Sequence, residues 1–291
     1  MGSTVCEKYG GAAIMIDLNL SGQTVFISGG TSGINLGIAE CFMDQGCNVF
    51  VVGRKQEKLD KAIEGLNSRK KGLAAGACTD VRNYDGVKAV FQACNDQFGQ
   101  IDVLISGAAG NFPALANGLS PNGFKSVIDI DLLGTFHVMR AGYPHLKQPG
   151  GRVINISAPQ AWLPMMAQVH VCAAKAGVDM VTKTLAMEWG PKGILVNSIS
   201  PGPIDGTEGM ERLAPTPELL ESTRDSVPIK RLGHPHDVGK VALMLASDLG
   251  AYVSGTVIPA DGGWSLSGAS GNMVTLAKLG EQMGFLKETP A

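Results

Sequence analysis

The 291-residue chain has few aromatic residues (5%), few charged residues (17%) and almost no net charge, since 24 Lys and Arg stand against 26 Asp and Glu. The densest basic cluster spans only residues 69–71, which disfavours a nucleic-acid binder that neutralises phosphates. No apolar stretch reaches the roughly 18 residues that a membrane span needs, and neither a signal pattern nor an S-K-L-type ending is found. We therefore expect a cytoplasmic protein that binds neither membranes nor nucleic acid.

Cysteine and histidine patterns typical of metal sites are also missing. Six cysteines form no C-x-x-C pair, which predicts free thiols in a reducing compartment. His234 and His236 lack helical metal-ligand spacing, so we expect a surface loop there and no metal. Glycine is abundant instead, at 39 residues, and hydrophobic residues make up 44% of the chain. This composition indicates a large core with many close backbone approaches, as in nucleotide-binding α/β proteins.

Short apolar, β-branched runs alternate with amphipathic segments along the chain. Continuous apolar strands are typical of a parallel sheet covered on both faces. Strict alternation of strands and helices predicts a single doubly wound Rossmann domain of the α/β class with a seven-stranded parallel sheet. We expect its core to cover residues 18–265 and a short C-terminal extension to cover 266–291. The expected strands are Thr24–Ser28, Asn48–Val52, Leu73–Cys78, Asp102–Ser106, Arg152–Ser157, Ile194–Ile199 and Thr256–Ala260, and the expected helices cover 33–46, 56–68, 83–98, 121–147, 168–189 and 235–247. The long stretch 201–235 is a candidate substrate lid.

A glycine-rich turn follows the first expected strand. It reads Ser28-Gly29-Gly30-Thr31-Ser32-Gly33-Ile34, and a helix follows. Glycines at this point let the backbone approach a pyrophosphate, which then binds the amides at the start of the helix. The alternative is a plain tight turn.

The end of the second expected strand discriminates between the nicotinamide cofactors. NAD-binding proteins place Asp or Glu there for the ribose hydroxyls, whereas this chain has Arg54 and Lys55. Two cations complement a 2′-phosphate and favour NADPH, unless they are only the solvated start of the next helix. Asp80 and Val81 follow the third strand, where an adenine edge would be read.

Two charged residues lie in apolar surroundings. Lys175 stands among small apolar residues of helix 168–189, and burying an ammonium costs several kcal/mol unless it is paired. It therefore either reaches the surface or points into a polar site. Asp131 in helix 121–147 poses the same question. Asp129, two residues away, points about 200° around a helix from Asp131, so the two carboxylates cannot share one face.

These residues together resemble the short-chain dehydrogenase/reductase family over about residues 18–265. The family's phosphate loop appears at 28–35, its N-N-A-G motif at 106–109, its active-site lysine as Lys175, its P-G motif at 201–202 and its A-D-G-G motif intact at 260–263. In this family the lysine also holds the nicotinamide ribose. The cofactor site expected from the residues and the resemblance comprises Gly29, Thr31, Ser32, Gly33, Ile34, Arg54, Lys55, Asp80, Val81, Ala108, Lys175, Pro201, Gly202 and Ile204.

Departures from the family pattern fall on the catalytic positions. The tyrosine position four residues before the lysine holds Val171, the serine position holds Ala158, and the asparagine position holds Asp131. The tyrosine position of the family's enoyl reductases holds Gln168. Valine and alanine carry no titratable proton, so the ordinary ketone–alcohol interconversion through a tyrosine is strongly disfavoured.

Two of these departures, the missing tyrosine and the aspartate at the asparagine position, are also found in 2,4-dienoyl-CoA reductases of the peroxisomal type, which the chain resembles around 108–112, 129–136 and 201–209. The resemblance implies NADPH-dependent reduction of a conjugated 2,4-dienoyl thioester, with a water held by Asp131 and Lys175 as the proton source. Asn111 is the candidate donor to the thioester oxygen, and Phe112 and His170 are candidate substrate contacts. An acyl-CoA substrate and a homotetramer built through helices 121–147 and 168–189 are also implied.

Other interpretations stay open at this point. Met165, Met166 and Met210 either line an acyl channel or pack in the core. The protein is alternatively another tyrosine-less NADP(H)-dependent oxidoreductase that acts on a different conjugated carbonyl. A third alternative is a non-redox lyase, isomerase or nucleotide-binding protein on the same fold.

Overall fold

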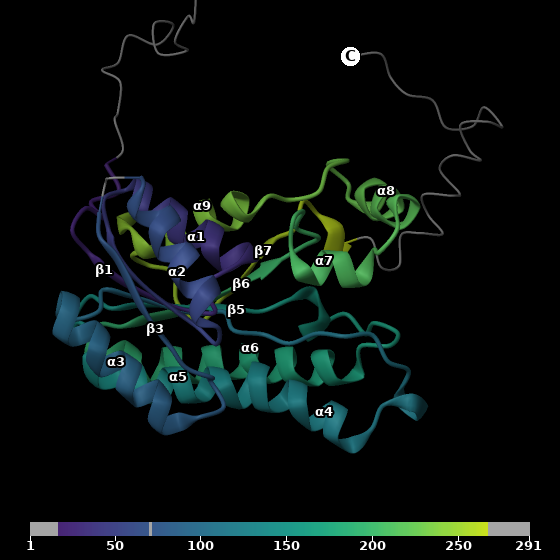
Figure 1. Cartoon of the computed structure of the whole chain (residues 1–291), viewed down its shortest axis with the longest axis horizontal. Helices are drawn as coiled ribbons and strands as arrows, with labels where there is room; N and C mark the ends of the chain where they lie inside the picture. Colours follow the sequence, from purple (N-terminus) through teal and green to yellow (C-terminus); the bar gives the residue numbers. More distant parts are fainter. Residues whose placement is uncertain (1–16, 70–71, 267–291) are drawn as a thin grey trace, which may run out of the picture.

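The sheet has seven parallel strands in the order β3-β2-β1-β4-β5-β6-β7 (Figure 1). The computed structural model describes residues 17–69 and 72–266, so the expected extension lies, apart from Leu266, outside the described residues. The chain starts in the middle of the sheet and winds outward twice, which confirms the predicted doubly wound architecture. The strands are β1 (Thr24–Ser28), β2 (Asn48–Gly53), β3 (Ala74–Cys78), β4 (Val103–Ser106), β5 (Arg152–Ile156), β6 (Leu195–Pro201) and β7 (Val257–Ala260).

Helices cover both faces of the sheet (Figure 1). One face carries α1 (Gly33–Asp44), α2 (Gln56–Asn67) and α9 (Pro235–Ala246). The other carries α3 (Tyr84–Phe98), α4 (Pro121–Val127), α5 (Gly134–Gly142) and α6 (Val169–Trp189). The stretch 201–235 holds two further short helices, α7 (Glu208–Leu213) and α8 (Pro217–Ser226).

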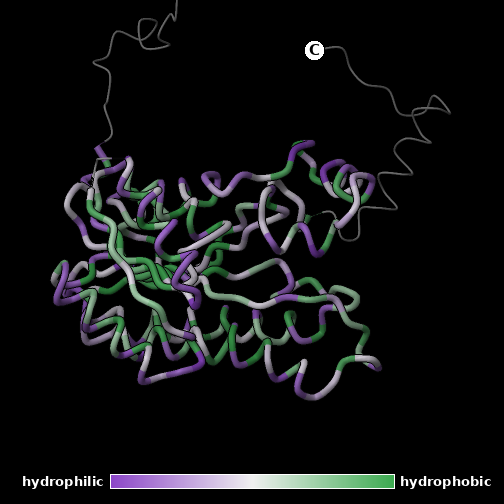
Figure 2. The backbone as a smooth tube through the Cα atoms, in the orientation of Figure 1, coloured by the Kyte–Doolittle hydropathy of each residue, from purple (hydrophilic) through white to green (hydrophobic). Residues whose placement is uncertain are grey.

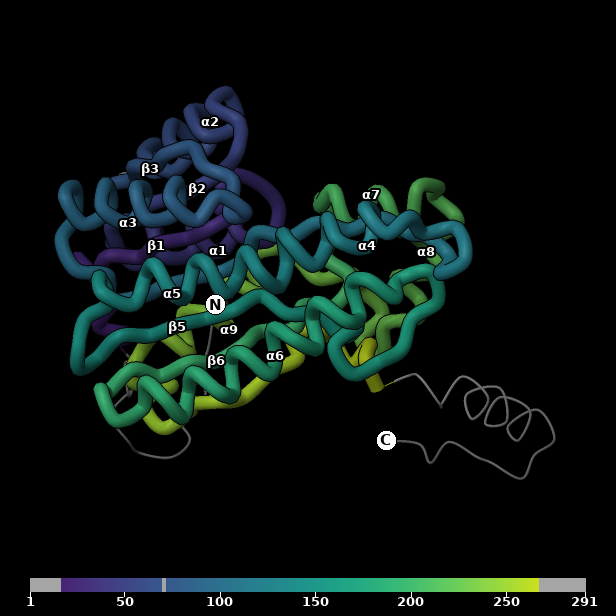
Figure 3. The backbone as a smooth tube through the Cα atoms, turned by 90° about the horizontal axis from the view of Figure 1, so that it is seen from below, coloured from purple at the N-terminus to yellow at the C-terminus, as the bar shows by residue number. Residues whose placement is uncertain are grey.

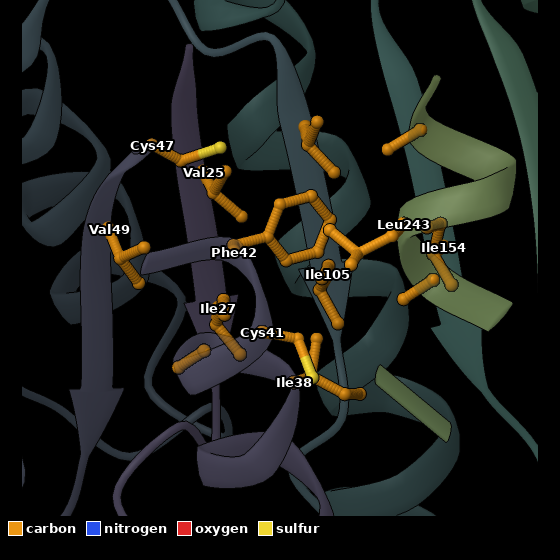
Figure 4. Close-up of a cluster of buried hydrophobic side chains, with 14 of the residues drawn as sticks. Val25, Ile27, Ile38, Cys41, Phe42, Cys47, Val49, Ile105, Ile154 and Leu243 are labelled. Atoms are coloured by element: carbon orange, nitrogen blue, oxygen red, sulfur yellow. The ribbon is translucent and has the colours of Figure 1, made fainter. Parts of the chain in front are cut away.

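Burial of both sheet faces explains why the strands are continuously apolar. Figure 2 shows hydrophobic residues gathered along the strands in the middle of the molecule. Between the sheet and helices α1 and α9, the fully buried ring of Phe42 lies among Val25, Ile105 and Leu243 (Figure 4). A second cluster on the opposite face includes stacked rings of Phe26 and Phe91 with centroids 4.0 Å apart.

The expected single helix over 121–147 is wrong in its interior. The segment is divided into α4, a π-helical turn over Ile128–Leu133, α5 and a short 3-10 turn over Tyr143–His145. Figure 3 shows α4 and α5 in one line beside α6. The π turn admits an extra residue into the helix and places Asp131 on the buried side, whereas Asp129 pairs with Lys125 at the surface.

The surface loop expected around the two histidines is also wrong. His234 is the N-cap of α9 and forms a capping box with Asp237, which satisfies amides at the start of the helix. His236 lies in the first turn of α9 and contacts Glu40, with 2.5 Å between the ring Nε2 and a carboxylate oxygen. Within residues 17–69 and 72–266, no group of three or more His, Cys, Asp or Glu side chains is arranged to hold a metal ion.

Candidate active site

A cavity of about 870 Å³ opens where the strands end. Its wall includes Gly29 after β1, Gly107 after β4, Ile156 at the end of β5 and Pro201 at the end of β6. In a doubly wound sheet this is the crevice in which ligands bind, because β1 and β4 lie where the direction of winding reverses. The wall contains all fourteen residues expected for the cofactor, together with Asp131 and Asn111.

The phosphate loop has the backbone that close approach to an anion requires. Gly29 has φ +73°, and a Cβ there would lie 2.9 Å from the backbone of Ala108, so only glycine fits. No side chain caps the first turn of α1, which leaves that helix start suited to a phosphate. Asn35 replaces a family glycine, and its Nδ2 donates to Gly107 O at 2.8 Å. This departure therefore joins the loop to the end of β4.

Three cations gather beyond the end of β2. Arg54 and Lys55 line the cavity, as does Lys58 in the first turn of α2, which the sequence analysis missed. Its position three residues after Lys55 at a helix start was the available signal. Lys58 Nζ lies 2.7 Å from Glu208 on α7 and links α2 to the stretch 201–235. Asp80 also lines the cavity, and the Arg82 guanidinium holds the pKa of its carboxyl below the usual range.

Asp131 and Lys175 meet in the deep part of the cavity. Asp131, in the π turn, is 1% exposed, and its Oδ1 accepts a hydrogen bond from Gly110 N at 2.7 Å. Its Oδ2 lies 3.4 Å from Lys175 Nζ, which also donates to Ile156 O at 2.9 Å. Lys175 is 6% exposed, so it does not reach the outer surface. The tertiary structure thus pairs the two charged residues that the sequence marked as anomalous.

Burial changes the acid–base behaviour of this pair. Removal of Asp131 from water raises its pKa, and Lys175, the Gly110 amide and His170 oppose that shift. A second buried carboxyl, Asp179, lies one helical turn beyond Lys175 and also has its pKa raised by burial. A carboxyl of raised pKa beside an ammonium can exchange a proton nearer to neutral pH than an ordinary aspartate. The pair has the properties of a proton donor.

No phenol lies beside this pair in the part of the chain that the structure describes. Tyr84, Tyr143 and Tyr252 are absent from the cavity wall, whereas Val171 and Ala158 belong to it. The fourth tyrosine lies outside the described ranges.

The expected substrate residues are placed differently from one another. Asn111 lines the cavity, its backbone O accepts from Arg212 Nη1 at 2.9 Å, and its Oδ1 is buried without a hydrogen-bond partner. Phe112 and His170 are not in the cavity wall. The His170 ring is fully buried against Phe112, with centroids 4.6 Å apart. The two rings therefore pack against each other, and their contact with substrate stays a prediction.

Three methionines and α7 also belong to the cavity wall. Met165, Met166 and Met210 all line it. Met166 is 88% exposed, whereas Met210 on α7 is buried. Because α7 lies in the stretch 201–235, that stretch forms one wall of the cavity.

A family model described as enoyl-(acyl carrier protein) reductase matches residues 29–265. The chain belongs to the short-chain dehydrogenase/reductase family, as the dinucleotide-type cavity and the buried lysine on α6 indicated. It is therefore an oxidoreductase with a nicotinamide cofactor. No helix in the described part of the chain is long and apolar enough to cross a bilayer.

Within the family the chain is similar to proteins named for one reaction. A peroxisomal 2,4-dienoyl-CoA reductase [(3E)-enoyl-CoA-producing] of Arabidopsis thaliana is 42% identical, over 84% of this chain and 85% of the relative. A probable 2,4-dienoyl-CoA reductase [(2E)-enoyl-CoA-producing] of Bacillus subtilis is 39% identical, over 83% and 96%. A crystal structure of a short chain dehydrogenase from Bacillus anthracis is 39% identical with a TM-score of 0.77, over 84% and 97%.

Proposed function

We propose that the protein reduces the conjugated system of a 2,4-dienoyl-CoA thioester with NADPH. The observation that carries this proposal is the buried Asp131–Lys175 pair, 3.4 Å apart, in a cavity wall where Val171 stands at the family's tyrosine position. Similarity to proteins named 2,4-dienoyl-CoA reductase supports the same substrate class.

The residues present fit NADPH. The glycine turn at Gly29 and the uncapped start of α1 suit the pyrophosphate. Arg54 and Lys55 complement the 2′-phosphate, and Lys175 is positioned to hold the nicotinamide ribose. When bound, NADPH supplies the hydride.

Proton delivery by the chain follows from where charge collects in the substrate. Addition of hydride at C5 of the diene moves electrons to the thioester oxygen and forms an enolate. Asn111 donates to this oxygen, a contact that can be worth about 3–4 kcal/mol in such sites. A water held by Asp131 and Lys175 then protonates C2, which leaves the double bond between C3 and C4. No alkoxide forms at the hydride-accepting carbon, so no tyrosine is needed there.

Consumption of NADPH across four substrate classes tests this function. We expect turnover with 2,4-dienoyl-CoA and none with enoyl-CoA, β-ketoacyl-CoA or free enones. The product should be a 3-enoyl-CoA, as in the name of the Arabidopsis relative. Turnover of free enones alone would favour a different conjugated carbonyl, and tight NADPH binding without any hydride transfer would favour a non-redox protein.

Assembly and location are part of the proposal. Phe136 on α5 and Met180 and Met187 on α6 are exposed apolar residues, and we propose that they are covered in a homotetramer. Light scattering on the purified chain tests this. The cytoplasmic location stays a prediction; since the Arabidopsis relative is named as peroxisomal, microscopy of the tagged full chain distinguishes the two compartments.

A further inference from the structure

Gln168 is held firmly at the start of α6. Its backbone N donates to Met165 O at 3.2 Å, and its backbone O accepts from Cys172 N at 2.8 Å. Ala167 before it has φ +60°, a left-handed conformation that costs an alanine energy. The Ala167 carbonyl accepts from Ala114 N at 2.9 Å. Contacts on both sides therefore fix where the Gln168 side chain begins.

The side chain of Gln168 has no partner within the protein. The residue is 4% exposed and lines the cavity. Both amide atoms, Nε2 and Oε1, are buried without a hydrogen bond, and the side chain does not cap α6. Among residues 17–69 and 72–266, Gln168 is the only side-chain amide with both polar atoms in this state. Such burial is unfavourable, so a ligand in the cavity is the natural partner.

The residues around Gln168 indicate which chemical group of a ligand would pair with its side-chain amide. The same wall contains the charged residues Asp131 and Lys175 and the apolar residues Val171 and Ala158. The N–H of a neutral amide can donate to an uncharged carbonyl oxygen of a ligand without a counter-charge. In an acyl-CoA, the carbonyl nearest to the reacting carbons is that of the thioester.

We propose that Gln168 Nε2 donates a hydrogen bond to the thioester carbonyl oxygen of the substrate. This inference rests on the proposed function and adds a second donor, beside Asn111, to the oxygen on which the enolate charge collects. Gln168 is then a catalytic residue, and its contact strengthens as that oxygen becomes negative. It also makes the enzyme selective for acyl groups with a carbonyl at this position.

The experiment compares two ligands that differ in that carbonyl. Calorimetry measures the Kd of a saturated acyl-CoA and of the S-alkyl CoA thioether of equal chain length, each with NADP⁺ present. We expect the wild type to favour the thioester about tenfold and Gln168→Met to bind both about equally. Gln160→Met is the matched control, because Gln160 also lines the cavity but none of its polar atoms is among those buried without a partner; it should keep the wild-type ratio.

Kinetics and stability separate this role from a structural one. Gln168→Met should lower kcat by about 10²–10³-fold, as loss of an oxyanion donor does, with an unchanged Kd for NADPH. Its Tm should equal or exceed that of the wild type, because methionine removes a buried unpaired amide at similar volume.

The inference is overturned if Gln168→Met keeps the wild-type ratio of thioester to thioether affinity. It is equally overturned if the variant loses affinity for both ligands alike together with a lowered Tm. In either case a wild type that reduces dienoyl-CoA leaves the proposed function intact. A wild type that neither reduces dienoyl-CoA nor binds either CoA ligand contradicts both proposals.

Discussion

Replacing Asp131 with asparagine tests the proton source most directly. In the wild type, Gly110 N donates to Asp131 Oδ1 at 2.7 Å. The side-chain oxygen of an asparagine can accept the same hydrogen bond. The substitution places an amide instead of a carboxylate oxygen 3.4 Å from Lys175 Nζ. The variant therefore preserves the shape of the site but removes both the exchangeable proton and the charge that faces the ammonium.

The expected loss of rate is large. A positioned general acid contributes about 10²–10⁴-fold, so Asp131→Asn should lower kcat for dienoyl-CoA by that factor. Lys175 also loses the partner of its buried charge, which costs about 3–5 kcal/mol of folding stability. Adding Lys175→Met removes the stranded ammonium and should restore much of the stability without restoring activity, which separates a folding defect from a catalytic one.

The direction in which kcat changes with pH provides a second test of Asp131. Burial raises the pKa of Asp131, while Lys175, the Gly110 amide and His170 oppose the shift. Below that raised pKa the pair holds one proton more than above it. We therefore expect wild-type kcat to fall as the pH rises through the pKa of Asp131, and the residual activity of Asp131→Asn to lack this decline.

Initial rates of NADPH consumption across a pH series, with urea denaturation of each variant, provide the measurement. Asp129→Asn is the control, because Asp129 lies two residues away and forms its ion pair with the exposed Lys125. It should change kcat less than twofold and stability by less than about 1 kcal/mol. Full activity in Asp131→Asn, or the same alkaline decline in both proteins, would refute the assignment.

Three further variants test the cofactor end and the core. Arg54→Ala should weaken NADPH binding about tenfold with little change for NADH, measured by fluorescence titration; equal NADPH affinity would remove the argument for a 2′-phosphate site. Phe42→Ala deletes a fully buried ring and should lower the free energy of unfolding by about 3–5 kcal/mol; a loss below 1 kcal/mol would mean that the cluster repacks. Gly37→Ala would place a Cβ 2.3 Å from Pro235 Cβ and should lower the free energy of unfolding by about 1–3 kcal/mol. An unchanged denaturation midpoint would show that α1 and α9 separate easily.

Local patterns in the sequence determined the sheet, the order of its elements and the cofactor end. Continuous apolar runs predict buried parallel strands, because a strand that is covered on both faces has apolar residues at successive positions. The glycine turn at 28–35 and the cations at Arg54 and Lys55 are contiguous features, and the structure places both in the cavity wall. The substitution of valine for the family's tyrosine at 171 is equally visible from the residues alone.

Only the tertiary structure decided how the chemical end is assembled. Asp131 and Lys175 lie on different helices, and their pairing depends on a π turn that helical periodicity does not reveal. The burial of His170 behind Phe112, and the unpaired amide of Gln168, likewise depend on segments distant in sequence. The periodicity of a sequence shows whether a residue faces inward. It does not show which polar partner the residue meets, because that depends on how elements distant in sequence pack together. This packing determines which charged groups and amides face the cavity.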